Sequence, residues 1–221
     1  MSAGAPSPAL AQGLASGAEA LGLELSHEQQ AQLLRYLGLI EKWNRVYNLT
    51  AIRRPDEMLT HHLLDSLAVV PPLRRHLGGA AARLLDVGSG GGLPGVVLAV
   101  CLPELTVTCV DAVAKKATFV RQVAAELGLK NLKAEHARIE DLPAAGAQVV
   151  SSRAFASLPD MTSLTSQHLS PNGVWMAMKG KRPDEEIDAL GLAVGVFHVE
   201  QLTVPGLDAE RCLVWLRPIS G

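Results

Sequence analysis

The 221-residue chain has no long apolar run and few cysteines. No apolar segment approaches the roughly 18 residues of a transmembrane helix, so we expect no membrane association. Residues 1–17 are rich in Ala, Gly, Ser and Pro, contain no basic residue, and do not resemble a secretory signal peptide. The three cysteines are far apart and lack metal-ligand spacing. They are typical of reduced core residues, which predicts a cytoplasmic protein without a metal site.

An excess of charge of one sign is also missing. The 20 Lys and Arg residues are balanced by 22 Asp and Glu residues, for a formal net charge of −2. Such a chain does not bind nucleic acid through a positive field over its whole surface, although a local basic patch is compatible with this charge. The apolar content of 48% is enough for a full hydrophobic core.

Glycine is concentrated in one stretch near the middle of the chain. The apolar run 84–87 is short enough for a buried strand, and it is followed by Gly88 and by Gly90–Gly92. The apolar segment 96–102 begins just after Pro94, as the first turn of a helix does. Glycines permit positive φ and let a ligand approach the main chain, and the first N–H groups of a helix are free. The stretch predicts a site for a nucleotide-like ligand, and a turn that binds nothing is the alternative.

The spacing of these glycines helps to choose the ligand. A dinucleotide fingerprint needs glycines at its first, third and sixth positions, but counting from Gly88 places Leu93 sixth. A later register from Gly90 to Gly95 fits, although it starts late after the strand, so a nicotinamide-dependent oxidoreductase remains an alternative. The pattern that fits better is Asp86-x-Gly88-x-Gly90-x-Gly92. It resembles the first motif of Rossmann-like S-adenosylmethionine methyltransferases.

Asp111 ends the next apolar, β-branched run, over 105–110. It follows the first strand at roughly the spacing, about 20 residues, at which an acidic residue binds the ribose in dinucleotide sites. We therefore expect Asp111 to contact the cofactor. The alternative is a cap on the helix that follows.

Strands and helices alternate along most of the chain. Strands are predicted at 84–87, 105–110, 132–136, 148–152, 174–178, 194–202 and 211–216, and helices at 26–47, 55–70, 96–102, 114–127, 158–169 and 183–190. The alternation predicts an α/β fold with helices on both faces of a parallel sheet. The link between the last two strands is too short for a parallel crossover, so these strands should pair antiparallel.

We therefore expect a seven-stranded, mostly parallel sheet with one antiparallel strand, the arrangement of Rossmann-like class I methyltransferases. Residues 1–25 are predicted to be a flexible tail, 26–80 a helical extension and 81–221 the Rossmann-like domain. The sequence 170–173 (Ser-Pro-Asn-Gly) predicts a turn between the fifth helix and the fifth strand.

Several phrases together resemble one family, the bacterial 16S ribosomal RNA guanine-N7 methyltransferases, also called glucose-inhibited division protein B. They are Lys42–Thr50 (KWNRVYNLT), His62–Leu67 (HLLDSL), Asp86–Gly95 (DVGSGGGLPG), Ser152–Ala156 (SRAFA) and Met178–Gly180 (MKG). The resemblance runs from about residue 25 to the end of the chain and is weakest after Gly191.

The resemblance implies S-adenosylmethionine as the cofactor and methylation of N7 of one guanine in 16S ribosomal RNA. The residues that it implies for the cofactor are Gly88, Gly90, Gly92, Leu93, Asp111, Ile139, Glu140 and Arg153. The expected partner is 16S ribosomal RNA within the small ribosomal subunit, and the protein is expected to be a monomer. A small-molecule methyltransferase on the same fold is the alternative.

Arg153 and Lys179 are the candidates for the catalytic site. Guanine N7 has an available lone pair in the neutral base, so no general base is required and positioning should supply most of the rate. Arg153 follows the fourth strand and is a candidate for binding the cofactor carboxylate, a phosphate or guanine O6, against a structural ion pair. Lys179 follows the fifth strand and is a candidate for an RNA phosphate, against a solvated lysine.

A basic patch on the same side is expected to hold RNA phosphates. Its candidate residues are Arg45, Arg53, Arg54, Arg74, Arg75, Lys179, Lys181 and Arg182. Trp43 and Tyr47 lie at helical spacing, which favours core packing over base stacking. His61 and His62 show no metal spacing and are expected at a helix surface or in the core.

Overall fold

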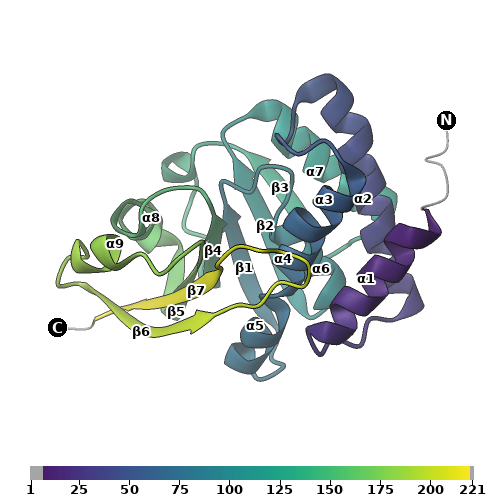
Figure 1. The fold of residues 1–221 in the computed structure, drawn as a ribbon. Coiled ribbons are helices and arrows are strands. Elements are labelled where there is room, and N and C mark those ends of the chain that lie inside the picture. Colours follow the sequence, from purple (N-terminus) through teal and green to yellow (C-terminus); the bar gives the residue numbers. More distant parts are fainter. Residues whose placement is uncertain (1–6, 220–221) are drawn as a thin grey trace.

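A computed structural model describes residues 7–219 and contains one seven-stranded sheet in the order β3-β2-β1-β4-β5-β7-β6 (Figure 1). The strands are β1 (Ala82–Val87), β2 (Leu105–Asp111), β3 (Leu132–His136), β4 (Ala147–Arg153), β5 (Leu169–Lys179), β6 (Val194–Gln201) and β7 (Cys212–Pro218). Strands β1 to β5 pair in parallel, and β7 pairs antiparallel with both β5 and β6. The predicted α/β sheet with one reversed strand is confirmed.

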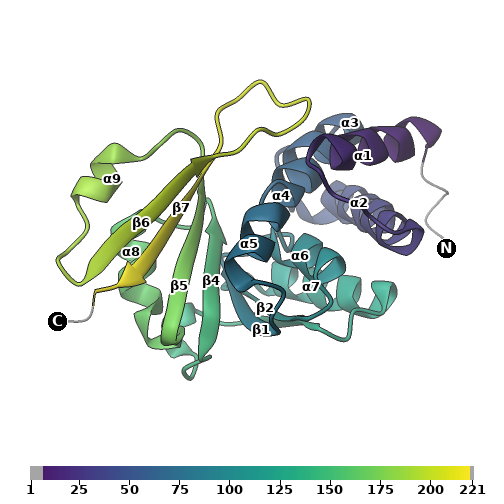
Figure 2. The same cartoon turned by 90° about the horizontal axis from the view of Figure 1, so that it is seen from below.

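Helices cover both faces of this sheet (Figure 2). They are α1 (Pro8–Ala20), α2 (His27–Tyr47), α3 (Pro55–Met58), the π-helix η1 (Leu59–Leu64), α4 (Asp65–Leu67), α5 (Val70–Leu77), α6 (Gly95–Cys101), α7 (Ala114–Leu127), the 3-10 helix η2 (Ile139–Asp141), α8 (Leu158–Thr165), the 3-10 helix η3 (Ser166–His168) and α9 (Asp184–Asp188). Among the described residues, no helix is both long and apolar enough to cross a bilayer. The three cysteines are buried and free, as predicted.

Alternating side chains of β1 divide the core into two layers. Leu84 faces the larger layer, which holds α6, α7 and the helices of the N-terminal extension. Leu85 and Val87 face the smaller layer, which holds α8. This division follows from the two-residue period of a strand, and it explains why β1 is apolar on both faces.

Helix α2 begins where the sequence predicts. Ser26 Oγ accepts a hydrogen bond from the Gln29 N–H at 3.1 Å, and Gln29 Oε1 accepts one from the Ser26 N–H at 3.0 Å. This capping box satisfies two N–H groups that the helix itself leaves free. Beyond it, Leu33, Leu37 and Ile40 recur at helical spacing and are buried.

Helix α1 corrects the prediction of a flexible tail over 1–25. Its start is capped by Ser7 Oγ, and its Leu14 and Ala18 are buried. A Cβ at Gly17 would lie 2.5 Å from the Leu64 side chain, so small residues allow α1 to pack closely on η1. The Ala and Gly content of this segment therefore reflects close helix packing rather than disorder. Residues 1–6 of the predicted tail lie outside the described residues.

The predicted turn over 170–173 is also wrong. These residues belong to β5, where the pairing with β4 jumps from Ala147–Leu169 to Val149–Val174. The strand therefore bulges, and Gly173 permits this because a Cβ there would lie 2.6 Å from the Ala147 carbonyl oxygen. The predicted helix over 158–169 is an α-helix to Thr165 and a 3-10 helix to His168.

Candidate functional site

The glycine turn lies at the carboxyl end of β1, immediately before α6. Gly88, Gly90 and Gly92 have φ of 66°, 58° and 90°, in the region that only glycine adopts without strain. The Ser89 carbonyl accepts hydrogen bonds from the N–H groups of Gly92 and Leu93, at 2.8 and 3.0 Å. The Ser89 N–H donates to the Val110 carbonyl of β2 at 3.1 Å. These bonds constrain the turn at Ser89, Gly92 and Leu93.

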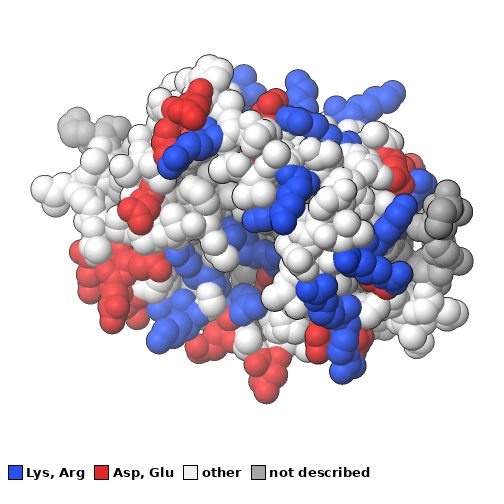
Figure 3. Space-filling model, turned by 90° about the horizontal axis from the view of Figure 1, so that it is seen from above, with Lys and Arg blue, Asp and Glu red and all other residues white. Residues whose placement is uncertain are grey.

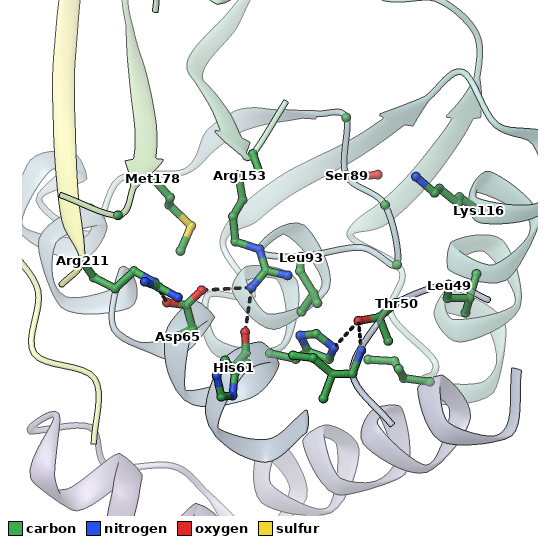
Figure 4. Close-up of a pocket in the computed structure, with 18 of the residues that line it drawn as sticks. Leu49, Thr50, His61, Asp65, Ser89, Leu93, Lys116, Arg153, Met178 and Arg211 are labelled. Atoms are coloured by element: carbon green, nitrogen blue, oxygen red, sulfur yellow. Dashed lines mark hydrogen bonds and ion pairs between the residues drawn. The ribbon is translucent and has the colours of Figure 1, made fainter. Parts of the chain in front are cut away.

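Two adjoining cavities open at this edge of the sheet, and Figure 4 shows the first of them. The first, of about 670 Å³, is lined by Gly88, Gly90, Leu93, Arg153 and Lys179 among others. The second, of about 740 Å³, is lined by Asp111, Ile139 and Glu140, and both are lined by Gly88, Lys116 and Ala154. The structure thus gathers the predicted residues around one edge, except Gly92, which lines neither cavity.

Asp111 is oriented by the main chain. Its Oδ2 accepts a hydrogen bond from the Gly90 N–H and its Oδ1 one from the Val113 N–H, both at 2.9 Å. Lys116 Nζ lies 3.7 Å from Oδ2. The N-cap residue of α7 is Val113, so the alternative of a simple helix cap does not hold. A carboxylate offers about four acceptor sites, so Asp111 keeps capacity for a ligand.

Asp86, the first residue of the glycine motif, does not line either cavity. Its Oδ2 accepts from the Gly95 N–H at 2.9 Å, and its Oδ1 accepts from the Ser151 hydroxyl at 3.1 Å. A Cβ at Gly95 would lie 2.8 Å from Asp86 Oδ2, so this helix start fits closely over the carboxyl group. Burial raises the pKa of Asp86 to about 7. Asp86 therefore joins α6 to β1 and β4 beneath the turn.

Two arginines share one buried carboxylate on the other side of the first cavity (Figure 4). Arg153 Nη1 donates to Asp65 Oδ2 at 2.9 Å and to the His61 carbonyl at 2.8 Å. Arg211 Nε donates to Asp65 Oδ1 at 2.7 Å. The Asp65 side chain is only 3% exposed, whereas each arginine keeps about a quarter of its surface exposed. Arg153 is thus in a structural ion pair and also lines the cavity.

We call Gly88–Leu93 with Asp111 the turn side, and Asp65 with Arg153 and Arg211 the arginine side. The sequence analysis did not assign Asp65 or Arg211 to the site. Asp65 lies in the phrase His62–Leu67, but that phrase does not give the residue a role. Arg211 lies 146 residues after Asp65, and only the fold brings the two together.

Lys179 is held rather than solvated. Its Nζ donates to Glu186 Oε2 at 2.7 Å and to the Ala156 carbonyl at 3.1 Å, and its side chain is 17% exposed. Glu186 belongs to α9 and also accepts a hydrogen bond from the Leu158 N–H. Lys179 thus links β5 to α9 at the rim of the first cavity.

The loop 48–52 forms a wall of the first cavity. Asn44 Oδ1 accepts from the Thr50 N–H, and Asn44 Nδ2 donates to the Ile52 carbonyl, both at 2.9 Å. His62 Nε2 lies 3.0 Å from Thr50 Oγ1. Burial, with Arg153 nearby, lowers the pKa of His62 to about 4, so this ring is neutral at neutral pH. The sequence analysis expected His62 in a core or surface position and missed its place at the cavity.

The other candidates lie mostly outside the cavities. Trp43 packs on Phe119 with ring centroids 5.3 Å apart, which agrees with a core role, and Tyr47 is 43% exposed. Of the eight basic residues predicted for a patch, Lys179 alone lines one of the two cavities at this edge of the sheet. Arg75 on α5 is paired with Glu200 of β6 instead. Figure 3 shows Lys and Arg side chains around a hollow in one face of the molecule.

The turn side fits S-adenosylmethionine. A Cβ on Gly90 would meet no protein atom within 4 Å, so the space in front of this main chain is open to a ligand. Asp111 supplies an oriented acceptor beside it, and Leu93 and Ile139 supply apolar surface. An open main chain, an acceptor for hydroxyls and apolar surface are what an adenosyl group with an amino-acid tail requires.

A model of the family described as rRNA small subunit methyltransferase G (GidB) matches residues 29–214. The chain belongs to this family. A ribosomal RNA small subunit methyltransferase G of Acidovorax ebreus (strain TPSY) is 64% identical over 215 residues, covering 94% of this chain and 95% of its own length. One of Methylibium petroleiphilum is 62% identical over 208 residues, covering 94% of each chain.

Solved structures share the fold at low identity. TrmN from Thermus thermophilus has a TM-score of 0.56 at 16% identity, over 96% of this chain and 78% of its own. A SAM-dependent methyltransferase from Aquifex aeolicus has a TM-score of 0.54 at 15% identity, over 74% of this chain and 97% of its own. Family membership confirms the predicted S-adenosylmethionine-dependent rRNA methyltransferase and excludes the oxidoreductase alternative.

Proposed function

We propose that the protein transfers the methyl group of S-adenosylmethionine to N7 of one guanine in 16S ribosomal RNA. It acts on the small ribosomal subunit, as a monomer in the cytoplasm. The observation that carries this proposal, together with the family, is the cavity itself. A cradle for the cofactor and a pair of arginines held by one carboxylate line the same space.

The turn side binds the cofactor. The main chain at Gly88 and Gly90 lies against it, Asp111 accepts hydrogen bonds from its hydroxyl groups, and Ile139 and Glu140 line the adjoining space. When bound, S-adenosylmethionine supplies an electrophilic methyl group on a sulfonium centre. The bonds from Gly90 and Val113 to Asp111 fix the carboxylate before the cofactor arrives, which lowers the entropic cost of binding.

The arginine side orients the target. Asp65, Arg153 and Arg211 carry a summed formal charge of +1, and both arginines keep N–H groups that the described bonds do not use. Such groups bind RNA phosphates or guanine O6. Lys179 adds a cation at the rim whose charge is largely compensated by Glu186.

The reaction needs no base from the protein. N7 of neutral guanine carries its lone pair in the plane of the ring, and its methylation displaces a neutral thioether. The rate enhancement therefore comes from alignment of the two reactants. A neutral His62 suits this site, because a further positive charge would repel the sulfonium group.

A structured ribosomal particle is the preferred substrate. The net charge of −2 gives the protein no general attraction to RNA, and the basic groups at the cavity are few and partly paired. Affinity must therefore come from a folded surface that presents the guanine.

The test uses tritiated S-adenosylmethionine, purified protein and small subunits from a strain that lacks the enzyme. We expect label in N7-methylguanine at a single rRNA position and much slower labelling of deproteinised 16S rRNA. Cofactor binding without label in any rRNA would contradict the proposed substrate, and equal labelling of both substrates would contradict the preference for the particle. Light scattering of the purified protein measures its molar mass and tests the proposed monomeric state.

A further inference from the structure

We infer that Tyr36, in the N-terminal extension, is a positioning residue for cofactor binding, because it holds the glycine turn in its binding conformation from behind. The Tyr36 hydroxyl donates a hydrogen bond to the Gly91 carbonyl at 2.6 Å, and the tyrosine lines neither cavity. The inference rests on the proposed cofactor site and assigns part of that site to the extension.

The buried position of the Tyr36 hydroxyl makes its hydrogen bond to Gly91 the feature that distinguishes tyrosine from phenylalanine here. Tyr36 is completely buried, and a buried hydroxyl without a hydrogen-bond partner is destabilising. Phenylalanine would fill the same volume without that cost. Within residues 7–219, the Gly91 carbonyl is the only hydrogen-bond partner of this hydroxyl group.

The ring is held firmly enough to act as a support. It lies against Phe119 of α7, with centroids 6.3 Å apart and planes 27° from parallel. Trp43, also of α2, packs on Phe119 as well, with ring centroids 5.3 Å apart. A Cβ on Gly92 would lie 3.4 Å from the Tyr36 oxygen, so the turn and the hydroxyl fit closely.

Helix α2 is fastened to both helices that border the turn. Gln29 Nε2 donates to the Val100 carbonyl near the end of α6 at 3.0 Å. Gln32 Nε2 donates to the Leu127 carbonyl at the end of α7, also at 3.0 Å. These bonds fix α2 on the two helices, and Tyr36 lies one turn further along α2 than Gln32, at the glycine turn.

The turn depends on such outside support. Its internal bonds run to the Ser89 carbonyl, and Gly90 is bound through Asp111, so the Gly91 peptide is fixed by Tyr36. Glycines lose more backbone entropy on ordering than any other residue. Without the hydroxyl, we expect the turn to sample other conformations, and the cofactor must then bear the cost of ordering it.

The experiment compares Tyr36→Phe with Gln32→Ala by calorimetric titration of S-adenosylmethionine. Tyr36→Phe should raise the Kd about three- to tenfold, the range of one lost neutral hydrogen bond. The kcat at saturating cofactor should stay unchanged. Gln32→Ala loses one bond of the same helix away from the turn. The Gln29 bond and the buried apolar residues of α2 still hold the helix, so this variant should lower the melting temperature and leave the Kd unchanged.

A second, spectroscopic measurement does not require the Tyr36→Phe variant. The chain has two tyrosines, so fluorotyrosine in a Tyr47→Phe background labels Tyr36 alone. Its fluorine resonance should shift on addition of S-adenosylmethionine, although the ring does not line the cavities. An unchanged resonance at saturating cofactor, an unchanged Kd in Tyr36→Phe, or an equal rise in Gln32→Ala would overturn the inference. Failure of the wild-type protein to bind the cofactor would instead reject the proposed function.

Discussion

The two sides of the first cavity are built in different ways. The turn side consists mainly of main chain from one short segment, joined to Asp111 by a bond from the Gly90 N–H. The arginine side consists of three charged side chains from distant segments, joined by one carboxylate. The turn side therefore depends on backbone conformation, and the arginine side on a balance of charge. Substitutions on the two sides should therefore have separable effects on cofactor binding and on stability.

The largest effect should follow from removal of the shared carboxylate. Asp65→Ala leaves two partly buried arginines facing each other without a counter-ion. We expect a loss of about 3 kcal/mol in the free energy of unfolding, the low end of the range for a broken buried ion pair. Urea denaturation measures it. Asp56→Ala, which removes an exposed partner of Arg54, is the matched control and should leave the unfolding midpoint unchanged. Equal behaviour of the two variants would mean that the arginine side does not depend on Asp65.

On the turn side, Asp111→Ala should act on the cofactor. It removes the acceptor of two N–H groups and the proposed acceptor for the cofactor hydroxyls, so we expect the Kd for S-adenosylmethionine to rise about 10- to 100-fold. Binding to the small subunit should change little. Calorimetry and filter binding measure the two affinities, with Glu135→Ala on β3 as an acidic control. A comparable loss of RNA affinity would show that the two sides are not separable.

The pH dependence of stability should reveal one buried titratable group next to each side. Asp86, beneath the turn, has its pKa raised to about 7 by burial, so its contribution is present at low pH and is lost as the pH rises through 7. His62, beside the arginine side, has its pKa lowered to about 4, chiefly by burial. Its contribution is present above its ordinary value of 6.5 and is lost as the pH falls through 4. In the wild-type protein, the two groups therefore change the free energy of unfolding in opposite directions as the pH rises.

Substitution of one residue at a time should separate the two contributions to the pH dependence of stability. Relative to wild type, Asp86→Asn should gain stability as the pH rises from about 4 to 7, because the group that loses stability over that window is gone. His62→Gln should lose stability relative to wild type over the same window. Urea denaturation across this pH range gives both differences. Parallel curves for either variant would show that its group does not titrate as described.

The smallest effect should come from an exposed cation near the rim. Lys181 follows the fifth strand and is exposed, so Lys181→Ala should reduce kcat/KM for the small subunit only about twofold. The slope of log affinity against log salt should fall by about one, as for the loss of one phosphate contact. Lys133→Ala, on β3, is the control. No difference between the two lysines would place Lys181 outside the RNA interface.

Much of the fold could be predicted from local patterns. The capping box at Ser26 set the start of α2, and the β-branched run before Asp111 set β2. The helix over 114–127 and the strand over 132–136 have the predicted bounds. Segment 8–20 and residues 170–173 were predicted wrongly, because packing on η1 and pairing with β4 override the low helix and strand preferences of their Gly, Ser and Pro residues.

Local sequence patterns were enough to specify the sheet, the glycine turn and the place of Asp111. These features depend on side-chain periodicity, on φ values open only to glycine, and on the order of elements along the chain. Only the tertiary structure decided that Asp65 holds Arg153 and Arg211, and that Tyr36 reaches Gly91. The physical reason is that an ion pair or a buried hydrogen bond requires two groups within about 3 Å, and no local pattern records which distant segments come that close.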